Sequence, residues 1–274
     1  MRQNKELIAT KDKSGEWLES ENCLTTDINR IMTKLFEVAS DRDFQIRELG
    51  TVGGEPILLL SQKKLLNKPN ILIAAGFHGD EPAGSWGILH FLETFPKDLL
   101  TINLSFLPLV NPTGFRNAKR TNNWGEDPNR GFYHTISGKP EPSREGLILL
   151  NHLSMLKYLA KDIFVSLHED WELSQFYIYT FEDTDTPGIF SDILRSAEAK
   201  FFEPYPDGPL EGGKVKDGII FKLCDGAFED LLFHEGVPMT ACTESPGNLD
   251  INKRIEANSC IIDHILKFAI SIQP

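Results

Sequence analysis

Uninterrupted runs of apolar residues alternate along this chain with amphipathic segments. The runs at 70–76 (NILIAAG), 102–112 (INLSFLPLVNP) and 162–168 (DIFVSLH) are typical of strands covered on both faces. Two further strands are expected at 176–181 and 237–244. Helical spacing predicts helices at 84–95, 143–160, 188–201 and 251–272.

The N-terminal part has a different pattern. Residues 26–40 place apolar side chains at helical spacing behind a capping residue, Thr26 or Asp27. Strands are predicted at 44–50 and 56–61, and the paired glycines of VGGEP between them suit a hairpin turn.

Strands that alternate with helices predict a single α/β domain with a central mixed, mostly parallel β-sheet flanked by helices. In such sheets ligands bind beyond the carboxyl ends of the strands. The polar residues at those ends are therefore the first candidates for a functional site.

Composition and charge exclude some classes of function. The chain has 274 residues and a formal net charge of −12, so a nucleic-acid or anionic-membrane partner is not expected, because both need a positive surface. No apolar run approaches the roughly 18 residues of a membrane span. The N-terminus has scattered charges and no apolar signal region, which predicts a cytoplasmic protein.

Polar residues end four of the predicted strands. His78 and Glu81 follow the first buried strand, Asn111 ends the second, His168 ends the third, and Glu244 ends the last. Two histidines and one glutamate, with water in the fourth position, form a known catalytic zinc set. Each motif alone has an ordinary structural explanation, but their shared position at strand ends favours a metal site.

A long polar loop, RTNNWGEDPNRGF, runs from Arg120 to Phe132. Loops of this length inside a compact domain are often functional. It is either a solvated loop anchored by Trp124, or a substrate loop in which Arg120 and Arg130 grip a carboxylate or a developing oxyanion.

In order along the chain, GFHGDE, NPTG, RTNNWGEDPNRGF, SLH and TESPG resemble the zinc carboxypeptidase superfamily. The similarity is greatest to its small bacterial members related to murein tripeptide amidase. It implies a catalytic domain at 51–274, preceded by an N-terminal helical and strand extension (1–50) packed on it. It also implies a hydrolase that depends on one Zn²⁺ ion and acts on a small peptide or N-acyl amino acid.

The resemblance also implies roles for single residues. His78, Glu81 and His168 match the zinc ligands, and Glu244 matches the general base that activates the hydrolytic water. Arg120 matches the residue that polarises the scissile carbonyl.

The same loop carries three more matches. Asn129 and Arg130 match the pair that holds the terminal carboxylate of the substrate. Asp127 matches a carboxylate that orients the first zinc histidine, a role with an independent physical basis.

The chain departs from the larger carboxypeptidases at several positions. No tyrosine lies between Tyr205 and Glu244, where those enzymes carry a mobile one, and Phe221 occupies that neighbourhood. Asp80 stands where digestive enzymes have an arginine. In GAFEDLLFHEGVP, Glu229 either faces the substrate and favours a basic group, or is an ordinary surface acid on a helix.

Three functions remain open at this point. The first is a metallopeptidase, acting as a carboxypeptidase or peptide amidase on a C-terminal or near-C-terminal amide bond. The second is an N-acyl amino acid deacylase of the aspartoacylase and succinylglutamate desuccinylase type. The single helix expected after Glu244 counts against this second function. The third is a non-catalytic binding module, which should have lost a ligand or the general base.

Overall fold

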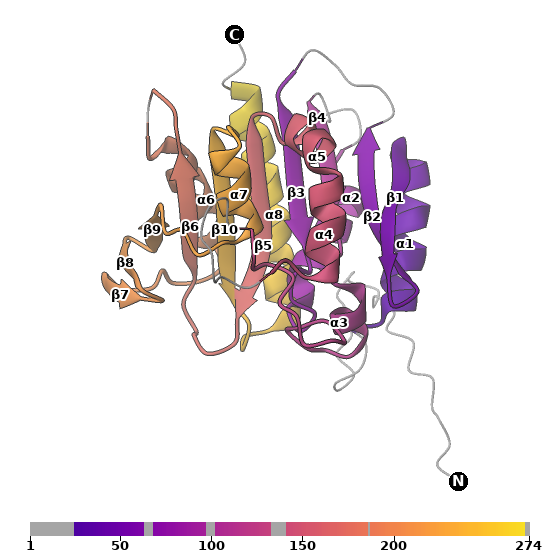
Figure 1. The fold of residues 1–274 in the computed structure, drawn as a ribbon. Coiled ribbons are helices and arrows are strands. Elements are labelled where there is room, and N and C mark those ends of the chain that lie inside the picture. The colour runs from indigo at the N-terminus through magenta and orange to yellow at the C-terminus, as the bar shows by residue number, and fades with distance from the viewer. Residues whose placement is uncertain (1–24, 63–67, 97–101, 133–140, 186, 272–274) are drawn as a thin grey trace.

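A computed structural model of the chain describes residues 25–62, 68–96, 102–132, 141–185 and 187–271. Within these residues ten strands form one sheet, in the order β1-β2-β4-β3-β5-β10-β6-β9-β8-β7 (Figure 1). The strands are β1 (Phe44–Val52), β2 (Glu55–Gln62), β3 (Asn70–Ala75), β4 (Asn103–Leu107), β5 (Ile163–Asp170), β6 (Tyr177–Glu182), β7 (Gly208–Leu210), β8 (Gly213–Lys216), β9 (Ile219–Phe221) and β10 (Met239–Pro246). The described helices are α1 (Ile28–Asp41), α2 (Pro82–Thr94), α3 (Pro112–Arg116), α4 (Arg144–Asn151), α5 (Leu153–Leu159), α6 (Ile189–Glu198), α7 (Phe228–His234) and α8 (Ile251–Ser271).

The centre of the sheet is parallel and its flanks are largely antiparallel. Strand β3 pairs in parallel with β4 and β5, and β5 pairs in parallel with β10. The hairpin β1–β2 and the strands β6, β8 and β7 add antiparallel pairs outside this centre. The predicted α/β fold with a mixed sheet flanked by helices is confirmed.

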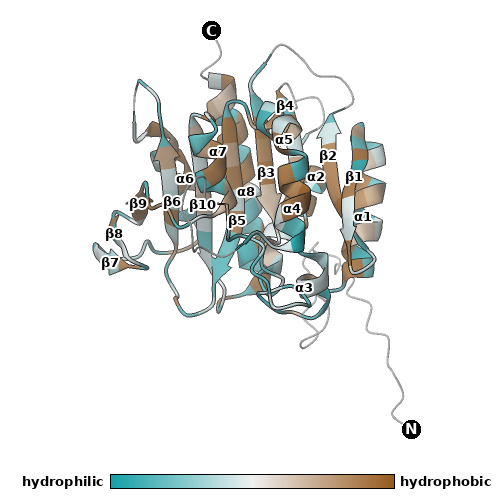
Figure 2. Ribbon diagram, in the orientation of Figure 1, coloured by the Kyte–Doolittle hydropathy of each residue, from teal (hydrophilic) through white to brown (hydrophobic). Residues whose placement is uncertain are grey.

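Helices cover both faces of the sheet, which explains the continuous apolar runs. Along β3, Ile71 and Ile73 pack into the core that includes residues of α1, α2, α6 and α8, whereas Leu72 and Ala74 pack into the core that includes residues of α4, α5 and α7. Figure 2 shows that β5 is hydrophobic along most of its length and becomes hydrophilic toward its carboxyl end. None of the described helices combines the length and the apolarity needed to cross a bilayer.

The N-terminal elements follow the prediction closely. Helix α1 begins after Asp27, whose side chain accepts a hydrogen bond from the Arg30 N–H at 3.0 Å. Between β1 and β2, Gly53 and Gly54 both have positive φ (61° and 86°), as a tight hairpin turn requires. Helix α1 packs into the main core and β1 pairs with β2. Residues 1–24 lie outside the described residues, and the division of the chain at residue 50 stays a prediction.

Three details differ from the sequence prediction. The prediction of a single helix at 143–160 is wrong, because α4 ends at Asn151 and α5 begins at Leu153. His152 lies between the two helices, and its Nε2 lies 2.9 Å from the Leu49 carbonyl oxygen. The strand predicted at 102–112 ends at Leu107, and residues after it still bond to the end of β3 through Val110 N–H to Ala75 O. The short elements α3, β7, β8 and β9 were not predicted, and a helix at α7 was part of only one of the two interpretations of Glu229.

Candidate metal centre and substrate cavity

The turn between β3 and α2 carries the first two candidate ligands. Gly76 has a φ of +64°, and a Cβ on Gly79 would lie 2.0 Å from the backbone carbon of Gly114. Both positions therefore demand glycine. Glu81 then stands at the N-cap of α2, followed by Pro82 in the first turn, where a missing N–H costs nothing. This turn brings His78 and Glu81 onto one side.

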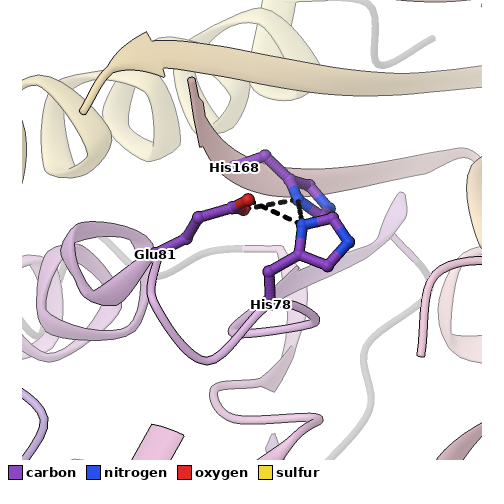
Figure 3. Close-up of side chains that lie close together, drawn as sticks. All are labelled: His78, Glu81 and His168. Carbon is purple, nitrogen blue, oxygen red and sulfur yellow. Dashed lines mark hydrogen bonds and ion pairs between the residues drawn. The ribbon is translucent and has the colours of Figure 1, made fainter. Parts of the chain in front are cut away.

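His78 and Glu81, which follow β3, converge on His168, which lies near the carboxyl end of β5 (Figure 3). Nδ1 of His78 lies 2.7 Å from Glu81 Oε1, and Nδ1 of His168 lies 2.7 Å from Glu81 Oε2. The two Nδ1 atoms are 3.2 Å apart. Two imidazole ligands of a tetrahedral zinc ion would lie about 3.3 Å apart. The donor types, and the spacing of the two imidazole nitrogens, therefore fit a zinc ion.

The electrostatics of the three side chains are strongly coupled. Burial disfavours ionisation of Glu81, but the adjacent His78 and His168 hold the pKa of its carboxyl well below the usual range. Burial lowers the pKa of His78, yet Glu81 and Asp127 outweigh this and raise the pKa to about 9. A cation is thus favoured at this point, and a divalent metal would take the place of the histidine proton.

Glu244 lies beside this group because β10 runs parallel to β5. In the register of the two strands, Glu244 is paired with His168, and on its other side with Tyr177 of β6. Burial, together with the nearby Glu81, outweighs the effect of His168 and raises the pKa of Glu244 to about 8. A carboxyl with a pKa in this range can exchange a proton near neutral pH.

Asp127 and Arg120 reach the group from the long loop. Asp127 Oδ1 lies 3.2 Å from Nε2 of His78, so the carboxylate holds the ring edge opposite Nδ1. Arg120 forms ion pairs with Glu81 at 3.5 Å and with Asp127 at 3.3 Å, while about half of its side chain (48%) stays exposed. The loop therefore places a cation at the mouth of the site.

Asn129 and Arg130 lie on the next part of the loop. The Asn129 Oδ1 accepts a hydrogen bond from the Phe228 N–H at 2.9 Å, and its Nδ2 lies 3.3 Å from Nε2 of His168. Arg130 donates to the Asn129 carbonyl oxygen at 2.8 Å and forms an ion pair with Asp225, also at 2.8 Å. The arginine that the sequence assigned to a substrate carboxylate is thus held by a carboxylate of the protein.

Glu229 is buried in the first turn of α7, with 3% of its surface exposed. Its carboxylate oxygens lie 3.4 and 3.5 Å from Asn129 Nδ2. Burial raises the pKa of this carboxyl, although His168 acts in the opposite direction. Glu229 is therefore not an exposed surface acid, and it lines the same cavity as the other site residues.

Asn111 and Glu169 have structural partners instead of a place in the metal group. The Asn111 side chain caps α3 by accepting from the Gly114 N–H at 2.8 Å, and donates to the Arg120 carbonyl oxygen at 3.1 Å. Glu169 forms a buried ion pair with Arg254 of α8 and accepts a hydrogen bond from the Ala83 N–H at 2.8 Å. Asn111 thus fixes the loop at Arg120, and Glu169 ties β5 to α2 and α8.

His78, Glu81, His168 and most of the residues around them line a cavity of about 380 Å³. Its walls contain two arginines and ten acidic residues: Asp80, Glu81, Glu169, Asp170, Glu172, Glu211, Asp225, Glu229, Asp230 and Glu244. The sequence patterns did not identify several other lining residues, among them Tyr177 and Tyr179, which lie on β6 next to β10. The alternation of FYIYTF was the available signal, because residues 177 and 179 share one face of the strand.

Comparison with known proteins agrees with this architecture. Residues 67–187 match the family described as succinylglutamate desuccinylase/aspartoacylase catalytic domain. A candidate metallopeptidase from Shewanella amazonensis SB2B is 38% identical, with a TM-score of 0.86 over 92% of this chain and 97% of that one. Among curated protein sequences no match was found.

More distant solved structures share the fold. A metallo-carboxypeptidase from Burkholderia cenocepacia is 17% identical and has a TM-score of 0.66, over 89% of this chain and 70% of that one. Murein-tripeptide amidase MpaA from Escherichia coli O157 is also 17% identical, with a TM-score of 0.57 over 81% and 91% of the two chains.

The matched family and the similar proteins support a hydrolase, and the buried His-Glu-His group provides its candidate metal centre. The chain belongs to the same family as the Shewanella metallopeptidase candidate, and the resemblance to the zinc carboxypeptidase superfamily that its motifs predicted is confirmed.

Proposed function

We propose that the protein is a zinc-dependent metallopeptidase that hydrolyses a C-terminal or near-C-terminal amide bond of a small peptide. The observation that carries this proposal is the convergence of His78, Glu81 and His168, with Glu244 in register beside His168. His78, Glu81 and His168 would hold the ion. When bound, zinc supplies Lewis acidity and lowers the pKa of a water molecule.

The side chains around this group have distinct roles in the proposal. Glu244, which lies in register beside His168, takes a proton from the attacking water and returns it to the leaving amine. Arg120 stabilises the negative charge that develops on the scissile carbonyl oxygen. Its half-exposed position at the cavity mouth is compatible with an approach to substrate.

Asn129 and Arg130 bind the terminal carboxylate of the substrate in this account. The Arg130–Asp225 ion pair must then loosen or be shared when the substrate arrives. Asp127 orients His78, because a hydrogen-bonded carboxylate fixes the ring of a ligand histidine and raises its basicity.

The cavity also favours a basic substrate. Its many carboxylates, Glu229 among them, provide a negative wall that would attract a lysine or arginine side chain or the amine of a diamino acid. Equal cleavage of otherwise identical peptides ending in Lys, Glu and Phe would contradict this part of the proposal.

A deacylase remains the second candidate, because the matched family description names succinylglutamate desuccinylase and aspartoacylase. The zinc-loaded protein should be assayed with a dipeptide series and, in parallel, with N-acetyl and N-succinyl amino acids. We expect the dipeptides to be turned over with the higher kcat/KM. Faster hydrolysis of the N-acyl amino acids would replace the peptidase proposal with the deacylase one.

A further inference from the structure

A second group of metal-binding side chains lies outside the candidate centre. Cys224, Asp230 and His234 bring one potential ligand atom each within 4.8 Å of one another. Asp230 and His234 are one helical turn apart on α7, and Cys224 lies on the segment that leads into this helix. The other described group that includes a cysteine, His168, Cys242 and Glu244, belongs to the candidate centre.

The distances within the new group match a tetrahedral ion. The Cys224 sulfur lies 3.6 Å from Nε2 of His234, and that nitrogen lies 3.1 Å from Oδ1 of Asp230. Standard zinc bond lengths place sulfur and nitrogen ligands about 3.5 Å apart, and nitrogen and oxygen ligands about 3.4 Å apart. Both observed distances are within about 0.3 Å of these values.

Asp230 is the buried member of this group. The residue is 4% exposed, and its Oδ1 atom forms an ion pair with Nε2 of His234 at 3.1 Å. The other oxygen, Oδ2, accepts a hydrogen bond from the Gly226 N–H at 3.1 Å, which fixes the orientation of the carboxylate. One oxygen is therefore anchored, and the other points toward His234 and the sulfur. This is the arrangement of a metal-binding carboxylate supported by a neighbouring donor.

The same three residues do not form a nucleophilic triad. In such a triad the acid binds one ring nitrogen and the nucleophile the other. Here the sulfur and the carboxylate oxygen both face Nε2 of His234. Burial and the nearby Asp230 also raise the pKa of the Cys224 thiol to about 11, so the free thiol is a poor nucleophile near neutral pH.

We propose that Cys224, Asp230 and His234 form a second metal site, which takes a thiophilic divalent ion such as Zn²⁺ and leaves its fourth position to solvent. The thiol loses its proton when the ion binds. The segment that the ion would fix contains Asp225 and Glu229, which line the substrate cavity. The site therefore links metal content to the shape of the cavity wall.

The test uses the full-length protein loaded with Co²⁺ after removal of zinc. A Co²⁺–thiolate bond gives a charge-transfer band in the near ultraviolet that imidazole and carboxylate ligands do not give. We expect this band, and two equivalents of Co²⁺, in the wild-type protein. Both the band and one equivalent should be lost in Cys224→Ser, and His234→Gln should bind one equivalent less.

Three variants identify the source of the band. Cys260→Ser is the matched control, because Cys260 also lies near a histidine nitrogen, His264 Nδ1 at 3.5 Å, but belongs to none of the potential metal-ligand groups in the described part of the chain. It should keep the band. His168→Ala should also keep the band and lose the other equivalent, which separates this site from the proposed catalytic one. A band that survives in Cys224→Ser and disappears in Cys242→Ser would overturn the proposal, as would a wild-type protein without the band. Circular dichroism confirms that each variant is folded.

Discussion

The contact between Asp127 and His78 offers a quantitative test of the metal centre. Asp127 Oδ1 lies 3.2 Å from Nε2 of His78, and the nearby carboxylate helps to raise the pKa of the imidazole. The change Asp127→Asn keeps the size of the side chain and one oxygen acceptor, but removes the negative charge. The ring should then be a weaker base at Nδ1, the atom that faces Glu81.

The expected size of the effect follows from the kind of contact. Loss of a hydrogen-bonded partner of a ligand histidine typically weakens metal binding about 10- to 100-fold, or roughly 1.4 to 2.7 kcal/mol. We expect Asp127→Asn to lie in this range. The loss should not be complete, because the three proposed ligands remain.

The assay is a competition titration of zinc against a chromophoric chelator. It is performed in the Cys224→Ser background, so that the proposed second site does not contribute. Asp183→Asn serves as the control, because Asp183 is exposed and lies outside the cavity wall. Equal zinc affinity in Asp127→Asn and in this control would refute the role of Asp127.

Three further predictions concern other parts of the site and the core. Arg120→Ala should lower kcat about 10²- to 10³-fold, and a kcat within a few fold of wild type would remove Arg120 from the account. Asp225→Asn should lower KM for peptides with a free carboxylate by up to about fivefold. The reason is that the partly exposed ion pair between Asp225 and Arg130, which contributes up to about 1 kcal/mol, no longer competes with the substrate for Arg130. An unchanged KM would contradict the role of Arg130. Burial raises the pKa of Glu198 to about 7. Between the ordinary pKa of a glutamate and pH 7, the unfolded chain therefore loses this proton while the folded chain keeps it. The stability of the folded protein falls as pH rises through this range. Glu198→Gln should therefore gain stability over wild type across this range, by roughly 3 kcal/mol at most at pH 8 and little near pH 4. Urea unfolding measures the difference, with the exposed Glu203→Gln as control. The same difference at both pH values would refute this prediction.

The sequence predicted the centre of the fold because that part depends on patterns that extend over many residues. Continuous apolar runs predicted β3 and β5, and their parallel pairing places His78 and His168 at one edge of the sheet. The shared carboxyl ends of parallel strands made it possible to predict which side chains would lie together.

Other features depend on contacts between distant segments, which a local pattern does not contain. The helix break at His152 is accompanied by a contact with the Leu49 carbonyl oxygen, about a hundred residues away. The ion pair between Arg130 and Asp225 joins a loop to the segment before α7. The strands β7, β8 and β9 are only three or four residues long, too short for a clear alternation.

Tyr177 and Tyr179 are candidates to replace the mobile tyrosine of the larger carboxypeptidases. The larger carboxypeptidases have a mobile tyrosine that this chain lacks at the matching place, and Phe221 there is half exposed at 51%. Tyr177 and Tyr179 reach the cavity from β6 instead. The Tyr177 hydroxyl donates to Asp170 at 2.9 Å. Tyr179 is therefore the better candidate for a substrate contact.

The central claim is that Glu244 acts as the general base beside a metal held by His78, Glu81 and His168. Its most direct test is a peptide-library digestion with the zinc-loaded protein, read by mass spectrometry, with Glu244→Gln in parallel. The account predicts release of C-terminal or near-C-terminal fragments by the wild-type protein, and loss of that release in Glu244→Gln at an unchanged zinc content. Equal digestion by both proteins, or no digestion by a wild-type protein that carries zinc, would contradict it.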